Sequence, residues 1–188
     1  MRNGFYGTAD EDVAPVEQSP QQQLFGALLS PFSSSGIRLR MTSLFINKDK
    51  LGSAMHAILH VDARDLDFIK EADGSHKAVF DIAAVIFGDN GAPVERFTYI
   101  HTIRSREQNF ARLLSNGFTY TMTVPIKKVG AYQLRTALRD QTSSRVGSAS
   151  QFIEVPDVKK NKLLISGILM RGVTLESYMK GVGLTTAE

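Results

Sequence analysis

The chain of 188 residues contains no cysteine and no tryptophan. Without cysteine it forms no disulfides and offers no thiolate chemistry, although this does not fix the compartment, because many exported bacterial domains also lack cysteine. No apolar run approaches the roughly 18 residues that a membrane-spanning helix needs. Met1–Gly4 does not lead into an apolar segment, so we expect no signal peptide in this chain and no membrane insertion.

The chain also lacks a large excess of either positive or negative charge. The chain has 22 basic and 19 acidic residues, which gives a formal net charge of +3. This balance disfavours a dedicated nucleic-acid binder, although the isoelectric point near 9.2 is on the basic side. The hydrophobic content of 43% is enough for one well-buried domain with extensions.

Motifs for catalysis and cofactor binding are missing as well. The sequence has no Gly-x-Ser-x-Gly elbow, no glycine-rich phosphate loop, no Cys/His metal spacing and no paired catalytic carboxylates. His56 and His60 are four apart in an expected strand, so they lie about 13 Å apart at ~3.3 Å per residue, too far for one metal. We therefore expect no enzyme activity, no catalytic residues and no cofactor.

The region from 124 to 155 shows the clearest strand pattern in the sequence. Tyr132, Leu134, Thr136 and Leu138 share one parity, and Gln133, Arg135 and Arg139 share the other. This period of two predicts a half-buried strand, and a second strand follows the polar turn at 140–144. Gly130 two residues before Tyr132 is typical of the tyrosine corner of immunoglobulin-like sandwiches, in which the ring fills the core and the hydroxyl bonds back to the chain.

Similar patterns predict the other elements. We expect strands at 37–45, 53–61, 77–87, 94–103, 118–124 and 163–170, short helical turns at 24–29 that plug one end of the domain, and a helix within 105–116 that Ser105 caps. The apolar strand 77–87 should be central, and Asp89-Asn90-Gly91 should turn tightly into its partner. Turns spaced by ~8–12 residues predict an all-β, immunoglobulin/fibronectin-III-like antiparallel β-sandwich with one or two short helices.

Composition divides the chain into three parts. Residues 1–22 are interpreted as the end of a preceding domain and a linker, because 7–23 is polar with Pro15, Pro20 and consecutive glutamines. Residues 23–156 form the sandwich. Residues 157–188 are expected to add one strand and a C-terminal extension.

An acidic loop is the weak candidate for a metal site. Asp62, Asp65 and Asp67 follow the second strand, and loop carboxylates can hold Ca²⁺ between sandwich domains. The spacing lacks the glycine and terminal glutamate of an EF-hand loop. The alternative is a solvated crossing loop whose aspartates accept local backbone hydrogen bonds. A hydrolase accessory domain using this loop is a further, less favoured hypothesis.

Two sets of strand side chains could contact a ligand. Tyr99, Phe118 and Tyr120 could form a platform on which sugar rings stack. Four arginines could form a basic stripe, although such residues more often belong to a solvated sheet face: Arg38, Arg40, Arg135 and Arg139.

Two sequence runs resemble a known family. Val124–Arg135 and Arg145–Pro156 resemble the C-terminal region of acidobacterial VWFA-related domain proteins, in which a von Willebrand factor A-like domain precedes a β-rich region. Arg2-Asn3-Gly4-Phe5-Tyr6 is similar to the end of that preceding domain. The likeness covers most of the chain and is strongest from Val124 to Pro156.

The resemblance implies an immunoglobulin-like fold in an exported, periplasmic or cell-surface protein, and it carries over no catalytic residues. A metal-dependent adhesion site would belong to the A-like domain. The expected function is a non-enzymatic interaction or spacer module of a larger exported bacterial protein, and the alternative is a carbohydrate-binding module. The expected partners are proteins, including an adjacent A-like domain, and not nucleic acid.

Overall fold

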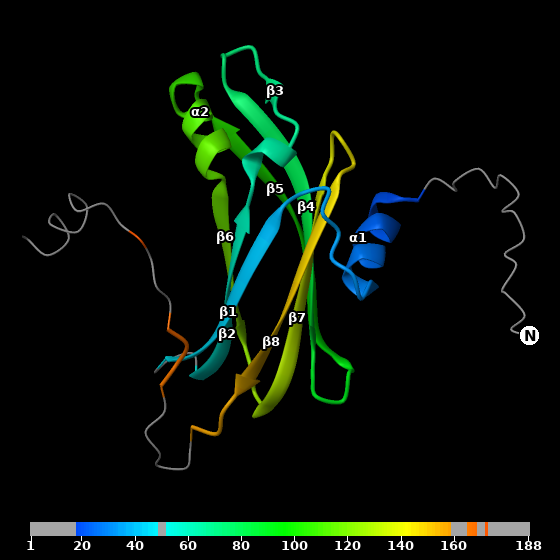
Figure 1. The fold of residues 1–188 in the computed structure, drawn as a ribbon, viewed down its shortest axis with the longest axis vertical. Coiled ribbons are helices and arrows are strands. Elements are labelled where there is room, and N and C mark those ends of the chain that lie inside the picture. Colours follow the sequence, from blue (N-terminus) through cyan, green and yellow to red (C-terminus); the bar gives the residue numbers. More distant parts are fainter. Residues whose placement is uncertain (1–17, 49–51, 159–164, 169–171, 173–188) are drawn as a thin grey trace, which may run out of the picture.

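The computed structural model describes residues 18–48, 52–158, 165–168 and 172, which form two facing antiparallel sheets (Figure 1). The interpreted linker up to residue 17 and most of the expected C-terminal extension lie outside these residues, whereas residues 19–22, expected to end the linker, cap and begin a helix. The all-β sandwich class with two short α-helices is confirmed. No helix in the described part of the chain has the length and apolar character needed to span a bilayer.

The smaller sheet has the order β1-β2-β6. It consists of β1 (Leu39–Lys48), β2 (Gly52–Val61) and β6 (Phe118–Pro125). β2 is central because its apolar residues alternate inward, and Ala57, Leu59 and Val61 are all fully buried. β6 lies at an edge and ends at Pro125, a residue that sheets tolerate at an edge position.

The larger sheet has five strands: β3 (Ile69–Lys70), β4 (His76–Phe87), β5 (Pro93–Ser105), β7 (Gly130–Asp140) and β8 (Val146–Val155). β4 is central as predicted, with β5 on one side and β7 followed by β8 on the other. The turn from β4 to β5 is tight, since Gly91 adopts a φ of 73° and the N–H of Gly88 donates to the Ala92 carbonyl. β3 was not predicted, because two residues are too few to show a period.

The core lies between the sheets and draws apolar side chains from both. Its largest fully buried members include Met55, Leu59, Ile82, Ile86, Leu134 and Leu138. Their parities on β2, β4 and β7 follow the alternation in the sequence, so the register of each strand is fixed by burial of one face.

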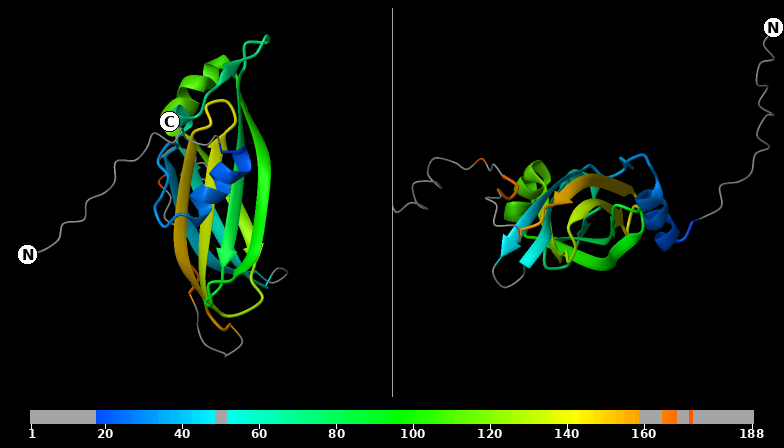
Figure 2. Two further views of the ribbon diagram at one scale, coloured as in Figure 1. Left: turned by 90° about the vertical axis from the view of Figure 1, so that its right-hand side faces the viewer. Right: turned by 90° about the horizontal axis from the view of Figure 1, so that it is seen from below.

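Helix α1 (Pro20–Leu29) covers the outer face of the larger sheet (Figure 2). Ser19 and Gln22 form a capping box at its start, and Pro20 occupies the first helical turn. Leu24 and Leu28 are buried in a second apolar cluster with Ala83, Val85 and Ala137 of β4 and β7. The expectation that this segment plugs an end of the domain is therefore wrong, and its contacts explain why β4 is apolar on both faces.

Helix α2 (Glu107–Asn116) lies at one end of the sandwich, as Figure 1 shows. The predicted cap at Ser105 is wrong: the cap position is Arg106, which makes no side-chain capping bond. Ser105 still belongs to β5, where it pairs with His76, and its hydroxyl donates to the Arg106 carbonyl. On α2, the Phe110 ring stacks on His76 at 3.7 Å between ring centroids, which holds the helix against β4.

The gap between β1 and β8 is bridged by one side chain. The amide of Gln151 accepts a hydrogen bond from the N–H of Ser43 at 2.7 Å and donates to the Ser43 carbonyl at 3.4 Å. Next along β1, the Phe45 carbonyl accepts from the N–H of Gly167 at 3.3 Å. The strand predicted at 163–170 is not formed at 165–168, and its other residues lie outside the described part of the chain.

Candidate interaction surfaces

The tyrosine corner residues occupy the positions expected of them. Tyr132 is 6% exposed, and its hydroxyl donates a 2.8 Å hydrogen bond to the carbonyl of Lys128. Gly130 begins β7 with a φ of 142°, a conformation that disfavours residues with a side chain. Burial, and then the nearby Asp89 carboxylate, raise the pKa of Tyr132, so it remains a protonated donor. This corner is structural.

The acidic loop is neutralised by arginines, and the cavity that Asp62 lines is also lined by Arg38, Arg40 and Arg64. Asp65 accepts from the Nε and Nη2 of Arg38 at 2.8 and 3.0 Å and also from the Arg38 backbone N–H. Ion pairs link Asp62 with Arg38 and Arg64, Asp65 with Arg38, and Asp67 with Arg145. The hydrogen bonds from these arginines hold the pKa values of Asp62 and Asp65 below their ordinary range.

Calcium binding by these aspartates is therefore a poor interpretation. Within the described residues, no group of three or more His, Asp or Glu side chains is placed to hold a metal ion. Asp62 instead caps the short 3-10 helix η1 (Ala63–Asp65) by accepting from the N–H of Arg64 at 3.1 Å. The alternative of a crossing loop with local backbone hydrogen bonds describes this segment better, with the addition of the ion pairs.

The three aromatic candidates do not form one exposed platform. Phe118 is half-buried, and its ring centroid lies 5.6 Å from that of Phe80 in the core. Tyr120 is also half-buried and bonds to the Nε2 of His101 at 3.1 Å. Burial, and then Tyr99, raise the pKa of Tyr120. Tyr99 alone is well exposed, at 52%.

The two arginines of β7 are not on a solvated face, because α1 covers them. Arg139 is 7% exposed and donates to the side chain of Gln23 in α1 at 2.7 Å. Arg135 donates through Nη1 to the carbonyls of Leu28 and Leu29 at 3.2 and 3.3 Å. The C-cap residue of α1 is Ser30, and these bonds from Arg135 add a side-chain cap to the last carbonyl groups of the helix.

An apolar pocket lies beside this cap, with a volume of about 430 Å³. Its floor is a row of outward side chains that are neighbours across three strands: Phe87 of β4, Gln133 of β7 and Phe152 of β8. Leu29 of α1 and the turn at 88–91 form its walls. The guanidinium of Arg135 lies 5.5 Å from the Phe87 ring centroid, which places one cation at an apolar site.

Two side chains of this pocket are unusually exposed for their type, Leu29 at 65% and Phe152 at 73%. Phe32, three residues after the end of α1, is 81% exposed. We call Leu29, Phe32, Phe152 and the pocket between Leu29 and Phe152 the α1 surface. Sequence reasoning missed it because its parts lie far apart in the chain. The signal that could have found it is Phe152, an aromatic residue on the outward parity of β8.

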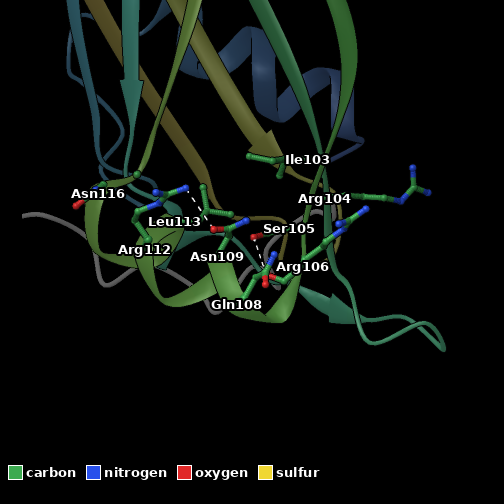
Figure 3. A pocket seen from close by; sticks show the side chains of 10 residues that line it. Ile103, Arg104, Ser105, Arg106, Gln108, Asn109, Arg112, Leu113 and Asn116 are labelled. Carbon is green, nitrogen blue, oxygen red and sulfur yellow. Dashed lines mark hydrogen bonds between the residues drawn. The ribbon is translucent and has the colours of Figure 1, made fainter. Parts of the chain in front are cut away.

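A second pocket, of about 500 Å³, lies where β5 meets α2 (Figure 3). Arg106 and Arg112 line it together with Asn109 and Leu113. Arg112 donates to Asn109 at 3.3 Å, and no described carboxylate forms an ion pair with Arg106 or Arg112. Arg104, at the rim, pairs with Glu71 at 2.9 Å. The pocket therefore carries positive charge that the described residues do not neutralise.

Comparison with known proteins identifies no family. No family model matches the chain, and no curated protein matches it. Solved structures of Bacteroides uniformis beta-glucuronidase 2 match weakly: a calcium-binding mutant has a TM-score of 0.35 and the enzyme bound to cyclophellitol-6-carboxylate aziridine has 0.34, both at 12% identity. Each match covers 62% of this chain and 13% of the other chain. This likeness carries no argument about function.

Proposed function

We propose that this chain is a non-enzymatic β-sandwich interaction or spacer module of a larger exported, VWFA-related bacterial protein. The observation that carries the proposal is the α1 surface, where Leu29 and Phe152 are exposed around an apolar pocket and Phe32 is exposed beyond the end of α1. Exposed apolar side chains that gather around a concave site are typical of protein-binding surfaces. The partner is a protein surface, and an adjacent A-like domain of the same full-length protein is the first candidate.

The α1 surface suits an apolar anchor from a partner. The pocket is lined mainly by apolar groups, and a Leu or Phe side chain buried there would contribute about 1.5–3 kcal/mol. Arg135 at its edge is fixed by its bonds to Leu28 and Leu29, so it can orient a partner carbonyl or carboxylate without being reordered. Leu28, which is 1% exposed, anchors the helix that forms one wall.

The absence of cysteine makes thiol labelling a direct test of this surface. The variant Phe152→Cys places one thiol on the α1 surface, and Thr121→Cys places a control thiol on the exposed side of β6. Labelling rates are compared between the isolated chain and the full-length protein in cells. We expect Phe152→Cys to react about tenfold more slowly in the full-length protein, which corresponds to ~1.4 kcal/mol of docking free energy. Equal slowing of both thiols, or of neither, would contradict docking at this surface.

The other parts of the proposal have their own tests. The full-length reading frame should encode an A-like domain and an export signal; a frame with neither would remove the family assignment but leave the docking test intact. A panel of hydrolase substrates should show no turnover. Turnover with a defined pH optimum that is lost when one carboxylate of the acidic loop, such as Asp65, is replaced would contradict the non-enzymatic assignment.

Carbohydrate binding is the second candidate, and the row of rings on β5 favours it. Phe97, Tyr99 and His101 share one face of the strand, with centroid distances of 5.7 and 6.1 Å between successive rings. Tyr99 presents its ring to solvent and could stack on a sugar. A glycan array should then give signals that Tyr99→Ala removes. An array without signal above background would exclude this candidate.

A further inference from the structure

Within the described part of the chain, strand β5 has a free edge along its whole length. It pairs only with β4 among the described strands, over residues 93–105. The N–H of Gln141 donates to the Val79 carbonyl, and this pair continues the register of β4 with β7. In an antiparallel ladder the hydrogen-bonded pairs come at every second residue. The backbone groups of odd-numbered β4 residues therefore bond to β7, and those of even-numbered residues bond to β5. Since Ile82 pairs with Tyr99, odd-numbered residues of β5 bond to β4. The backbone groups of the even-numbered residues, Thr98, Ile100 and Thr102 among them, therefore point outward.

The middle of this edge lacks the features that usually protect one. Residues 97–103 read Phe-Thr-Tyr-Ile-His-Thr-Ile, with high strand propensity, no proline and no Asp, Glu, Lys or Arg. Ile100 is 68% exposed, and the register shift of β5 lies near its start, at the pair of Phe87 with Pro93. By contrast, the edge of β1 that does not pair with β2 is covered at Ser43, where the Gln151 side chain bonds to the backbone. An open edge of this kind is a template for another strand.

The edge runs from the β4–β5 turn to the arginine pocket at α2. Ile103 to Ser105 are the last residues of the edge, and together with Arg106 they line one side of the pocket (Figure 3). A segment added along β5 would therefore have one end beside Arg106 and Arg112, whose charges the described carboxylates do not pair with. Antiparallel pairing is the more stable arrangement, and it places the amino end of the added segment at this pocket.

We propose that β5 accepts an extended segment of another protein as an added antiparallel strand, with β-branched or aromatic residues along Thr98–Thr102 and acidic residues at its amino end bound by Arg106 and Arg112. Main-chain hydrogen bonds to Thr98, Ile100 and Thr102 hold the strand, and the two arginines set its direction and its register. This surface is separate from the α1 surface, so the two proposals succeed or fail independently.

The probe is a fluorescein-labelled peptide of about ten residues, with two glutamates at its amino end and alternating threonine and valine after them. A matched peptide carries two lysines in place of the glutamates. Thr98→Pro removes an N–H that points to the free edge while leaving the bonds to β4 in place. Its control is Thr121→Pro, which removes an outward N–H from the edge strand β6. The N–H of Ile126 donates to the Ser53 carbonyl, so even-numbered residues of β6 bond to β2 and the N–H groups of odd-numbered residues such as Thr121 point outward.

We expect the acidic probe to bind in the micromolar range by fluorescence anisotropy, and Thr98→Pro to weaken it by about tenfold or more, while Thr121→Pro leaves it unchanged. Charge reversal at Arg106 and Arg112 and the lysine-headed peptide should each weaken binding by about tenfold, whereas Arg96→Glu, at the far end of β5, should not. If Thr98→Pro does not fold, Ile100→Asp tests the same edge through an exposed side chain.

Three results would overturn the proposal. One is no binding of the acidic probe at a concentration of about 1 mM. Another is equal effects of the two proline variants, or equal binding of the acidic and basic probes. The third is a dimer of the chain that Thr98→Pro disrupts while the probe does not compete, since a second copy would then occupy the edge.

Discussion

The hydroxyl and the ring of Tyr132 should contribute separately to stability. Tyr132→Phe removes one hydrogen bond of 2.8 Å to the carbonyl of Lys128, a residue exposed enough for water to replace the lost donor. The expected cost is about 1 kcal/mol of the free energy of unfolding. Tyr132→Ala also removes a ring that is 6% exposed and packed in the core, so the expected cost is about 3–5 kcal/mol.

The assay is urea unfolding followed by far-UV circular dichroism, because the chain has no tryptophan to report by fluorescence. Tyr132→Phe should lower the midpoint without changing the slope, and it should lower the melting temperature by about 3–6 °C. The cost of Tyr132→Ala should be a large part of the free energy of unfolding, which is about 5–15 kcal/mol for an ordinary domain.

Tyr99→Phe is the matched control, because the Tyr99 hydroxyl makes no hydrogen bond to a described residue and its ring is 52% exposed. It should leave the midpoint unchanged within error. The reasoning is refuted if Tyr132→Phe is as stable as the wild type, or if Tyr132→Ala costs no more than Tyr132→Phe. Either result would mean that the corner does not hold β7 against the core.

Three further changes test other contacts. Arg38 holds the pKa of Asp65 low, so the Asp65 carboxylate stabilises the fold above its unfolded-state pKa and loses this effect as the pH falls through the folded-state pKa. Asp65→Asn should therefore lower the free energy of unfolding at neutral pH. In urea titrations it should also flatten the decline of that free energy between roughly pH 5 and pH 2. Gln151→Ala should cost about 1–3 kcal/mol by leaving the buried N–H of Ser43 unpaired, whereas Ser43→Ala, whose hydroxyl has no partner among the described residues, should cost almost nothing. Leu28→Ala should cost about 2–4 kcal/mol and make the amides of α1 exchange faster with deuterium; unchanged exchange would contradict the docking of α1.

The strands could be predicted because the alternation of apolar and polar residues within each strand shows which of its faces is buried. In β2 and β7 most of the residues on the inward parity are apolar, so period and register follow from local sequence. The corner at Tyr132 and the turn at Asn90-Gly91 are also local, since each depends on a glycine at a fixed offset. Helix boundaries were less accurate, because Ser105 suits both a cap and the end of a strand.

The surfaces could not be predicted, because they depend on which segments meet. Arg135 and Arg139 have the pattern of a solvated sheet face, and only the position of α1 shows that they are covered. The acidic loop has the composition of a metal site, but its carboxylates meet Arg38 and Arg145 from distant segments. The arginine pocket at α2 depends on how the helix folds back on the end of β5.

The measurement that tests the central claim most directly is hydrogen–deuterium exchange of this chain alone and within the full-length protein. If the α1 surface is a docking site, exchange over α1 and the part of β8 around Phe152 should be slower in the full-length protein, while exchange over β2 stays the same. Identical exchange over α1 and β8 in both forms would contradict the claim that this surface docks against another domain of the full-length protein.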